Sequence, residues 1–401
     1  MTERPATAPV DSSSDSFVRD PAPHYAVLRE TCPISWQPRS NAWLIARYDD
    51  AVAALRNPHM AHVGILRPWF ALRDRHGIDF PNSIKVVSAM AFNYEGDAHT
   101  VMRRTFAKAI APFANVQDRF RAAADRLLDK GRREGRFDFA EDFANRLLFE
   151  IICDLSDINA ADRPTLYPMS RLSWAADAEI SIRERRIMED ALRDVLELLR
   201  DRAPAILERS PDGLLASMRG ALPDDEPDKT EATIVNFCVM LMMGNDALGG
   251  SFAFAVRWLL DEARTEDERI PQSQWGELAD EIFRFSAPVD FLSRFATGDT
   301  SVGGVEMASG DRLLASPLGG NHDSSKFGPN AESVCPHSQQ GVGLTFGAGR
   351  HLCVGMQMSR SISQSAMQAL AELPEMALAG PTVQARGKII RTLESMPVVL
   401  T

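Results

Sequence analysis

The chain has 401 residues, of which 45% are hydrophobic and 25% are charged, as in an ordinary globular protein. Its formal net charge of −11 argues against a nucleic-acid-binding protein, because phosphate groups are bound by basic surfaces. We find no run of about 18 uncharged apolar residues, so we expect no membrane-spanning segment.

The N-terminal segment MTERPATAPVDSSSDSF is polar and contains acidic residues, so it lacks the apolar centre of a signal peptide. This composition predicts a disordered tail over residues 1–17, followed by a single domain over residues 18–401. The cysteines are scattered and odd in number, which argues against a disulfide framework and favours a cytoplasmic location. They are Cys32, Cys153, Cys238, Cys335 and Cys353.

Apolar residues recur at helical spacing through most of the chain. We expect long helices over residues 118–133, 185–202 and 233–262. Strand-like sequence is limited to residues 42–47 and 397–400, and a loop-rich segment covers residues 298–343. The pattern predicts a mainly α domain with a small β region to which both ends of the chain contribute.

The segment FGAGRHLCVG, residues 346–355, places one cysteine after an arginine and a histidine and among three glycines. The residues leave three interpretations open. Cys353 could be a small core residue, since free cysteines are commonly buried. It could bind zinc together with Cys335, His337 and His351, although their spacing is unusual for structural zinc sites. It could also be a thiolate ligand of haem iron.

The haem interpretation accounts for the residues around the cysteine. N–H groups at the start of a helix stabilise a thiolate. Gly347, Gly349 and Gly355 would let the backbone turn and approach a flat ring where a side chain would collide. Phe346 can pack beside the sulfur and exclude water. Partners for the carboxylates of the macrocycle would be Arg350 and His351.

The same ten residues resemble the haem-binding loop of the cytochromes P-450, whose pattern is F-G-x-G-x-H-x-C-x-G. Every fixed position is filled, by Phe346, Gly347, Gly349, His351, Cys353 and Gly355. Glu281 and Arg284 are similar to the family's structural E-x-x-R element, and on a helix they would share a face. Turns at residues 309–311 and 321–323 also resemble family motifs, with Ser309 and His322 as mild departures.

Further resemblance covers nearly the whole chain from about residue 20. Arg294 matches the R-x-A element, whose arginine binds a haem propionate, and residues 96–113 are similar to the family's C helix. His99 and Arg103 lie one turn apart there, so with Arg294 and His351 they give four candidate ligands for two propionates. The implied fold is a triangular helical prism with a small β region, in which haem b lies between the long central helix and the cysteine-loop helix.

The resemblance also implies an activity. A thiolate ligand donates electron density to iron and favours O–O cleavage, so we expect a monooxygenase. The sequence shows no membrane anchor or fused reductase and therefore resembles the bacterial members. These take electrons from NAD(P)H through a ferredoxin and a ferredoxin reductase. A basic docking face for the acidic ferredoxin is expected from Arg103, Arg104, Lys108, Arg350 and Arg360.

The substrate is expected to be a small, partly apolar molecule such as a secondary-metabolite intermediate. Apolar residues that could line its pocket, although such residues more often form plain core, are Trp69, Phe70, Met90, Phe92, Phe252, Val289, Phe291 and the run 240–243. Asp290 lies near the haem in this reading. It either pairs with an arginine or binds a polar group of the substrate.

The central helix departs from the family pattern A/G-G-x-D/E-T, whose acid and threonine guide protons during oxygen activation. Gly244, Asn245 and Asp246 match this catalytic element, but Ala247 occupies the threonine position. Alanine cannot donate a hydrogen bond, so we expect atypical or substrate-assisted proton delivery, with Asp246 and water as one source. Alternatively, Asn245 or water covers the loss.

Two consequences of this segment stay open. Gly249 and Gly250 are expected to weaken the helix and to widen the groove beside it. The departure at Ala247 also leaves room for oxidative coupling or a peroxide-driven reaction without oxygen insertion. A non-enzymatic haem sensor is a further alternative, because a fold does not fix a function.

Overall fold

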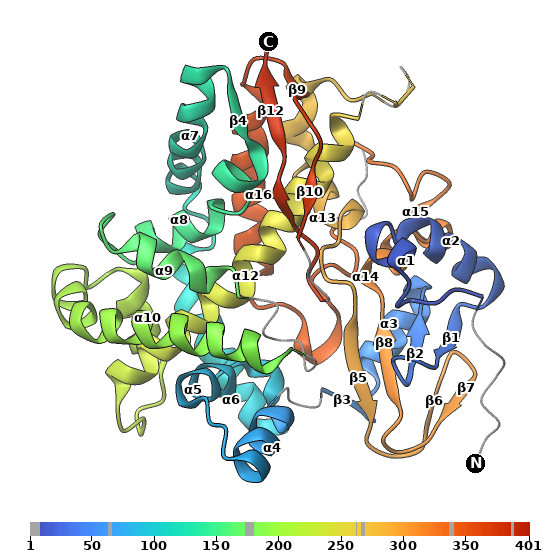
Figure 1. Cartoon of the computed structure of the whole chain (residues 1–401), viewed down its shortest axis with the longest axis horizontal. Coiled ribbons are helices and arrows are strands. Elements are labelled where there is room, and N and C mark those ends of the chain that lie inside the picture. Colours follow the sequence, from blue (N-terminus) through green and yellow to red (C-terminus); the bar gives the residue numbers. More distant parts are fainter. Residues whose placement is uncertain are drawn as a thin grey trace.

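The computed structural model describes residues 9–62, 66–172, 180–261, 263–265, 269–336, 341–385 and 389–401. Most helices gather on one side of the molecule and most strands on the other (Figure 1). The long helix α12 (Lys229–Leu259) crosses the middle between them. The prediction of a mainly α fold with a small β region is confirmed.

The three long helices expected from periodicity are present as α7 (Gln117–Glu134), α10 (Ile182–Arg209) and α12. α10 begins with a capping box in which the side chains of Ser181 and Glu184 each accept a backbone N–H of the other. The remaining helices with roles below are α2 (Ala22–Thr31), α3 (Tyr48–Arg56), α4 (Arg67–His76), α5 (Pro81–Ser88), α6 (Gly96–Ile110), α8 (Leu147–Leu155), α9 (Arg163–Ser170), α11 (Leu214–Ala221), α13 (Glu281–Phe285), α14 (Pro317–Asn321), α15 (Ser324–Phe327) and α16 (Met356–Ala371).

The largest sheet has the strand order β1-β2-β8-β5-β3. Its strands are β1 (Ile34–Gln37), β2 (Ala42–Ile45), β3 (Met60–Ala61), β5 (Leu292–Ala296) and β8 (Arg312–Ala315), of which β2 and β8 are parallel. A second sheet has β12 (Pro397–Leu400) between β4 (Arg136–Asp138) and β9 (Met376–Leu378). Both strands expected from sequence are therefore present, as β2 and β12.

The loop-rich segment is more regular than expected. It contains the hairpin of β6 (Thr300–Val302) and β7 (Val305–Met307), then β8, α14 and α15. Tight glycine turns join these short elements, which explains why the composition indicates loops: Gly303 and Gly304, between β6 and β7, have φ of 54° and 80°.

The prediction of a disordered tail over residues 1–17 is wrong for the part that the structure describes. Helix α1 (Asp15–Arg19) begins after Ser14, whose side chain accepts the N–H of Phe17. Val10 and Phe17 are buried, and Gln37 binds this segment through hydrogen bonds to the backbone of Val10 and Ser12. Two apolar side chains among many polar ones are enough to anchor it; residues 1–8 lie outside the described residues.

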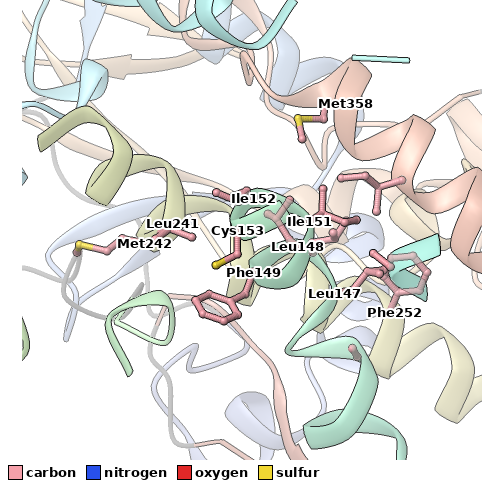
Figure 2. Close-up of a cluster of buried hydrophobic side chains, with 14 of the residues drawn as sticks. Leu147, Leu148, Phe149, Ile151, Ile152, Cys153, Leu241, Met242, Phe252 and Met358 are labelled. Atoms are coloured by element: carbon pink, nitrogen blue, oxygen red, sulfur yellow. The ribbon is translucent and has the colours of Figure 1, made fainter. Parts of the chain in front are cut away.

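The main core lies where α8 meets α12 and α16. Figure 2 shows the apolar side chains of α8, Leu147 to Cys153, between those of α12 and Met358 of α16. By length and composition alone, α12 could cross a membrane. However, 72% of the most apolar 18-residue stretch of α12 is buried inside the protein, as in a core helix.

The two glycines in α12 serve close packing. A Cβ atom on Gly250 would lie 2.2 Å from the carbonyl oxygen of Arg391, and one on Gly249 would lie 2.9 Å from that of Ala144. The helix continues through both residues without a break. The expectation that they widen a groove is therefore wrong, because backbone from two other segments fills the space.

Candidate functional site

The cysteine loop is held by its own backbone. Cys353 lies between the 3₁₀ helix η7 (Gly349–His351) and α16, and its N–H donates to the carbonyl oxygen of Phe346 at 2.8 Å. Gly347 and Gly349 have φ of 76° and 71°, the left-handed region that favours glycine. A Cβ atom on Gly349 would lie 2.5 Å from the carbonyl oxygen of Leu55, so the loop also packs tightly on α3.

The thiol of Cys353 lies in a mixed electrostatic environment. Although Cys353 is exposed, desolvation by the surrounding protein raises the pKa of its thiol; the backbone N–H groups of Gly355 and Met356 and the charge of Arg103 lower it, and the net shift is upward. These three groups all stabilise a thiolate, and binding to a metal ion removes the thiol proton outright.

Two of the three interpretations of this cysteine lose support. Cys353 is exposed, unlike Cys153 and Cys238, so it is not a small core residue. The zinc interpretation depends on His337, which lies outside the described residues. Within the described ranges, no group of three or more His, Cys, Asp or Glu residues could hold a metal ion.

Side chains from three elements converge beside the loop. His99, on α6, is buried, and its ring centre lies 4.3 Å from that of His351. Arg103, one turn along α6, donates to the carbonyl oxygen of Leu352. Arg294, on β5, is buried in the same region, since its charge acts on the pKa of both His62 and His351. The four candidate propionate ligands are thus brought together.

Two further members of this cluster were missed from the sequence. Glu95 accepts hydrogen bonds from Arg350 at 3.0 Å, from His351 at 3.1 Å and from the backbone N–H of His62 at 2.8 Å. Burial lowers the pKa of His62 and of His351 to about 4, so both rings are neutral at pH 7. Glu95 immediately precedes α6. This position, just before the segment that resembles the family's C helix, is the only sequence feature that could have indicated a role for Glu95.

The cluster fits an anionic group. Arg294 is 4% exposed and, within the described residues, hydrogen-bonds only to the backbone carbonyl of Ser293. Burial lowers the pKa of its guanidinium to about 10, which reflects the cost of a buried charge without a carboxylate in contact. A bound carboxylate would remove that cost, so the residues are suited to a cofactor that carries carboxylates next to Cys353.

The central helix exposes one stripe. In the stretch from residue 240 to residue 253 of α12, only Met240, Met243, Gly244 and Ala247 are partly exposed, and their spacing places them on one helical face. Asp246 is on another face, where it is buried and forms an ion pair with Arg171 at the end of α9. Arg171 was also missed, because it is 75 residues away in sequence.

The surroundings of Asn245 favour a structural role over the predicted catalytic one. Its side chain is fully buried and turned toward α8 and α9. Its Oδ1 accepts the N–H of Phe149 at 3.1 Å, and its Nδ2 donates to the carbonyl oxygen of Asn145 at 2.7 Å. Gly244 likewise packs on α8, since a Cβ atom there would lie 2.6 Å from Cδ2 of Leu148.

Replacing Asn245 by alanine is expected to lower the free energy of unfolding by about 2 kcal/mol, because two buried backbone groups lose their partners. Urea unfolding measures this loss. Asn236→Ala is the matched control on the same helix, since the Asn236 side chain makes no hydrogen bond within the described residues; we expect less than about 1 kcal/mol there. Equal losses in the two variants would contradict the structural role.

Asp290 pairs with an arginine, one of the two alternatives left by the sequence. Its Oδ1 lies 2.8 Å from Nε of Arg391, and burial raises its pKa to about 6 despite that partner. Several pocket candidates are core residues instead. Trp69, Met90 and Phe252 are buried in the main core, and Phe291 packs against Phe17.

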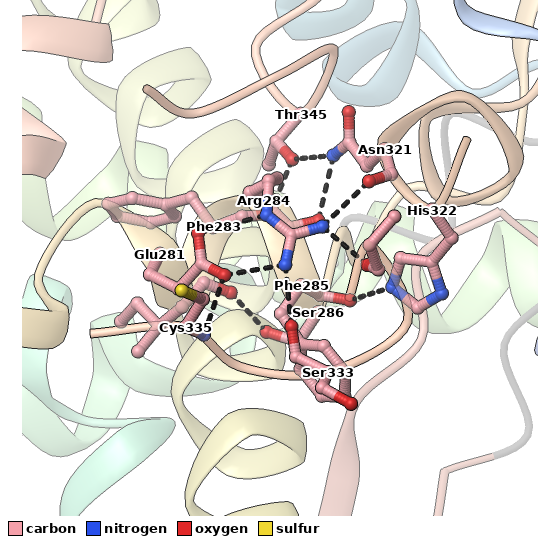
Figure 3. A network of polar contacts seen from close by, with 12 residues as sticks. Glu281, Phe283, Arg284, Phe285, Ser286, Asn321, His322, Ser333, Cys335 and Thr345 are labelled. Carbon is pink, nitrogen blue, oxygen red and sulfur yellow. Dashed lines mark hydrogen bonds and ion pairs between the residues drawn. The ribbon is translucent and has the colours of Figure 1, made fainter. Parts of the chain in front are cut away.

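A buried polar network supports the cysteine loop from α13 (Figure 3). Arg284 and Glu281 pair through both carboxylate oxygens, at 2.5 Å and 2.9 Å, as their spacing predicts. Arg284 also donates to the carbonyl oxygens of Asn321, Ala331 and Ser333. His322, the departure from the family's arginine, stacks on Phe285 and its Nε2 lies 2.8 Å from that residue's carbonyl oxygen.

Comparisons with known proteins agree with this geometry. The family model described as Cytochrome P-450 matches residues 278–371, which include α13, Arg294 and the cysteine loop. The chain is 25% identical over 365 residues to cytochrome P-450 109 of Bacillus spizizenii, covering 88% of this chain and 84% of that protein.

Two further comparisons, one with a protein sequence and one with a solved structure, extend the likeness to nearly the full length. The chain is 24% identical over 413 residues to 6-deoxyerythronolide B hydroxylase of Saccharopolyspora erythraea, covering 97% of this chain and 98% of that protein. The crystal structure of CalO2 superposes with a TM-score of 0.84 at 22% identity and covers 98% of each chain. The structural likeness to CalO2 shows a shared fold.

Proposed function

Because the chain belongs to the cytochrome P-450 family, whose members are monooxygenases, we propose that it binds haem b through Cys353 and oxidises a small organic molecule. The observation that carries the proposal is the exposed Cys353, with the backbone N–H groups of Gly355 and Met356 at its sulfur. Haem with a thiolate ligand supplies the activation of dioxygen, because the thiolate donates electron density to iron.

We assign the haem propionates to the cluster beside the loop. Arg294, His99 and Arg103 provide the positive and hydrogen-bonding groups, and His351 completes the set predicted from sequence. Glu95 has a positioning role, because its hydrogen bonds join His351 and Arg350 of the loop to the segment before α6. Phe346 packs edge-to-face on Phe283 of α13, at a ring distance of 5.0 Å, and so holds the start of the loop.

The residues of α12 define the substrate side. Met240, Met243 and Ala247 share the partly exposed face, so a substrate would contact methyl and thioether groups there. Asp246 is held by Arg171 on a different face. It can pass protons to this side only when the ion pair opens or when water links the two faces, which supports delivery by a protic group on the substrate itself.

Ala247→Thr tests substrate-assisted proton delivery. With the native substrate we expect NADPH use to be tightly coupled to product in the parent enzyme, because the substrate supplies the hydrogen bond that alanine cannot. Analogues without the protic group are expected to release peroxide, and the threonine should improve these analogues more than the native substrate. Peroxide and product are measured per NADPH consumed.

The mechanism would be contradicted if Ala247→Thr raised turnover of the native substrate and left the analogues as uncoupled as before.

Oxygen insertion is tested with isotopically labelled dioxygen. Label in the product supports monooxygenation. A product without label favours the second candidate, oxidative coupling, which the missing hydroxyl at Ala247 leaves open.

We propose that the substrate is a secondary-metabolite intermediate, as the name of the related 6-deoxyerythronolide B hydroxylase suggests for that relative. Electrons would come from NAD(P)H through a ferredoxin and its reductase in the cytoplasm. Arg104 and Lys108 are exposed on α6 and are suited to an acidic donor. Arg350 and Arg360 contribute less charge than expected, because Glu95 and Asp280 pair with them.

The function is tested by two readings on the haem-loaded protein with surrogate redox partners. A substrate should shift the Soret band and stimulate NADPH consumption together. A protein that binds haem but shows neither response to any candidate substrate would favour the non-enzymatic sensor.

A further inference from the structure

A cavity of about 850 Å³ lies away from the cysteine loop. Its walls come from α2, the C-terminal end of α12, α13, α14 and the turn after β9. None of its lining residues belongs to the cluster of Cys353, His99, Arg103, Arg294 and His351. The volume is in the range of sites for small organic ligands, about 300–1,000 Å³.

One wall is a continuous aromatic stack. The guanidinium of Arg264 lies 3.3 Å from the ring centre of Trp258, Trp258 meets Phe285 edge-to-face at 5.1 Å, and Phe285 stacks on His322 at 5.3 Å. Trp258, Phe285 and His322 all line the cavity. Such a wall favours a planar aromatic ligand.

Positive charge surrounds a second ring, that of Phe254, one helical turn before Trp258 on α12. The guanidinium groups of Arg391 and Arg257 lie 5.1 Å and 6.0 Å from the ring centre of Phe254. Arg391 is only 8% exposed in its side chain; its Nε faces Asp290 and one Nη donates to the carbonyl oxygen of Ala287. Its other Nη makes no hydrogen bond within the described residues, so the N–H groups of that nitrogen remain for a ligand.

Carboxylates on the same cavity limit the charge of that ligand. Asp20, Asp261 and Glu332 line it, and Glu332 already forms an ion pair with Arg29. Four arginines line the same cavity, which leaves a formal excess of one positive charge. A single carboxylate, within reach of Arg391 and Arg257, therefore matches the lining better than a polyanion such as a nucleotide. We propose that this cavity is a second ligand site, separate from the haem site, for an aromatic monocarboxylate.

The floor of the cavity is connected to the haem-side backbone. The N–H of Arg391 donates to the carbonyl oxygen of Pro288 at 2.8 Å, and its own carbonyl oxygen packs on Gly250 of α12. Pro288 precedes the segment that leads to Arg294. A ligand on Arg391 therefore contacts a residue whose backbone touches both α12 and that segment.

The site is tested with 2-naphthoate, a simple aromatic monocarboxylate, by calorimetric titration of the haem-loaded protein. We expect one saturable site, with no Soret shift and no competition by imidazole, which binds haem iron. Binding should weaken about tenfold in Arg391→Gln, in Arg257→Gln and in Trp258→Leu. The uncharged 2-naphthamide should bind about tenfold more weakly than the acid.

Matched controls separate the site from general charge effects. Arg219→Gln, on the exposed side of α11, should leave the affinity unchanged. Arg257 is exposed, so its variant keeps the test valid if loss of the buried Arg391 prevents folding. Absence of saturable binding would overturn the proposal. So would an affinity in Arg257→Gln and Trp258→Leu equal to that of the unsubstituted protein, or binding that shifts the Soret band and is blocked by imidazole.

Discussion

Arg284→Met is expected to prevent recovery of stable folded protein, with a loss of about 3–5 kcal/mol in the free energy of unfolding. The substitution leaves the buried carboxylate of Glu281 without its partner, and three backbone carbonyl groups lose their donor. These carbonyls belong to the segment from residue 321 to residue 333, whose anchoring to α13 depends on Arg284 (Figure 3). The loss is measured by urea unfolding, or by soluble yield if no folded protein remains.

Arg360→Met is the matched control. Two nitrogens of Arg360 also bind a carboxylate, that of Asp280, at 2.5 Å and 2.7 Å. However, both side chains are more than a third exposed. An ion pair in that setting contributes at most about 1 kcal/mol. If Arg284→Met cost no more than Arg360→Met, the account of the buried network would be wrong.

Cys353→Ser is expected to abolish NADPH-driven oxidation completely and to weaken haem retention. Serine keeps the size of the side chain but does not form a thiolate, so the electron donation that favours O–O cleavage is lost. Turnover and haem content per protein measure the effect. The overall fold should persist, since the loop is held by the glycines and by the bond from the Cys353 N–H to Phe346.

Cys335→Ser is the control for this cysteine. Cys335 contributes its backbone N–H to Glu281, and serine preserves that hydrogen bond, so haem content and turnover should be unchanged. Equal damage from the two substitutions would favour a site that uses both cysteines and would contradict the assignment to Cys353 alone.

Local motifs were predicted well because their geometry is set within a few residues. Glycines at 347 and 349 require left-handed backbone, and the spacing of Glu281 and Arg284 places them on one helical face. The fold followed from these motifs through the family resemblance. Helical periodicity also gave α7, α10 and α12, although with ends displaced by one to several residues.

Contacts between distant segments could not be read from the sequence. Glu95 meets His351 across 256 residues and Asp246 meets Arg171 across 75, and no local pattern indicates either pair. The direction of Asn245 was missed for a related reason: a family motif gives its position in sequence, but the side chain turns to whichever neighbour offers backbone partners. Gly249 and Gly250 were judged by helix propensity, whereas tertiary packing decides their role.

The central claim, that Cys353 binds haem iron as a thiolate, is tested most directly by one spectrum. The haem-loaded protein is reduced, exposed to carbon monoxide, and its difference spectrum is recorded. We predict the Soret band of a thiolate-ligated carbon monoxide complex. A band at the position given by a neutral thiol or a histidine ligand, in protein that is folded and haem-loaded, would contradict the account.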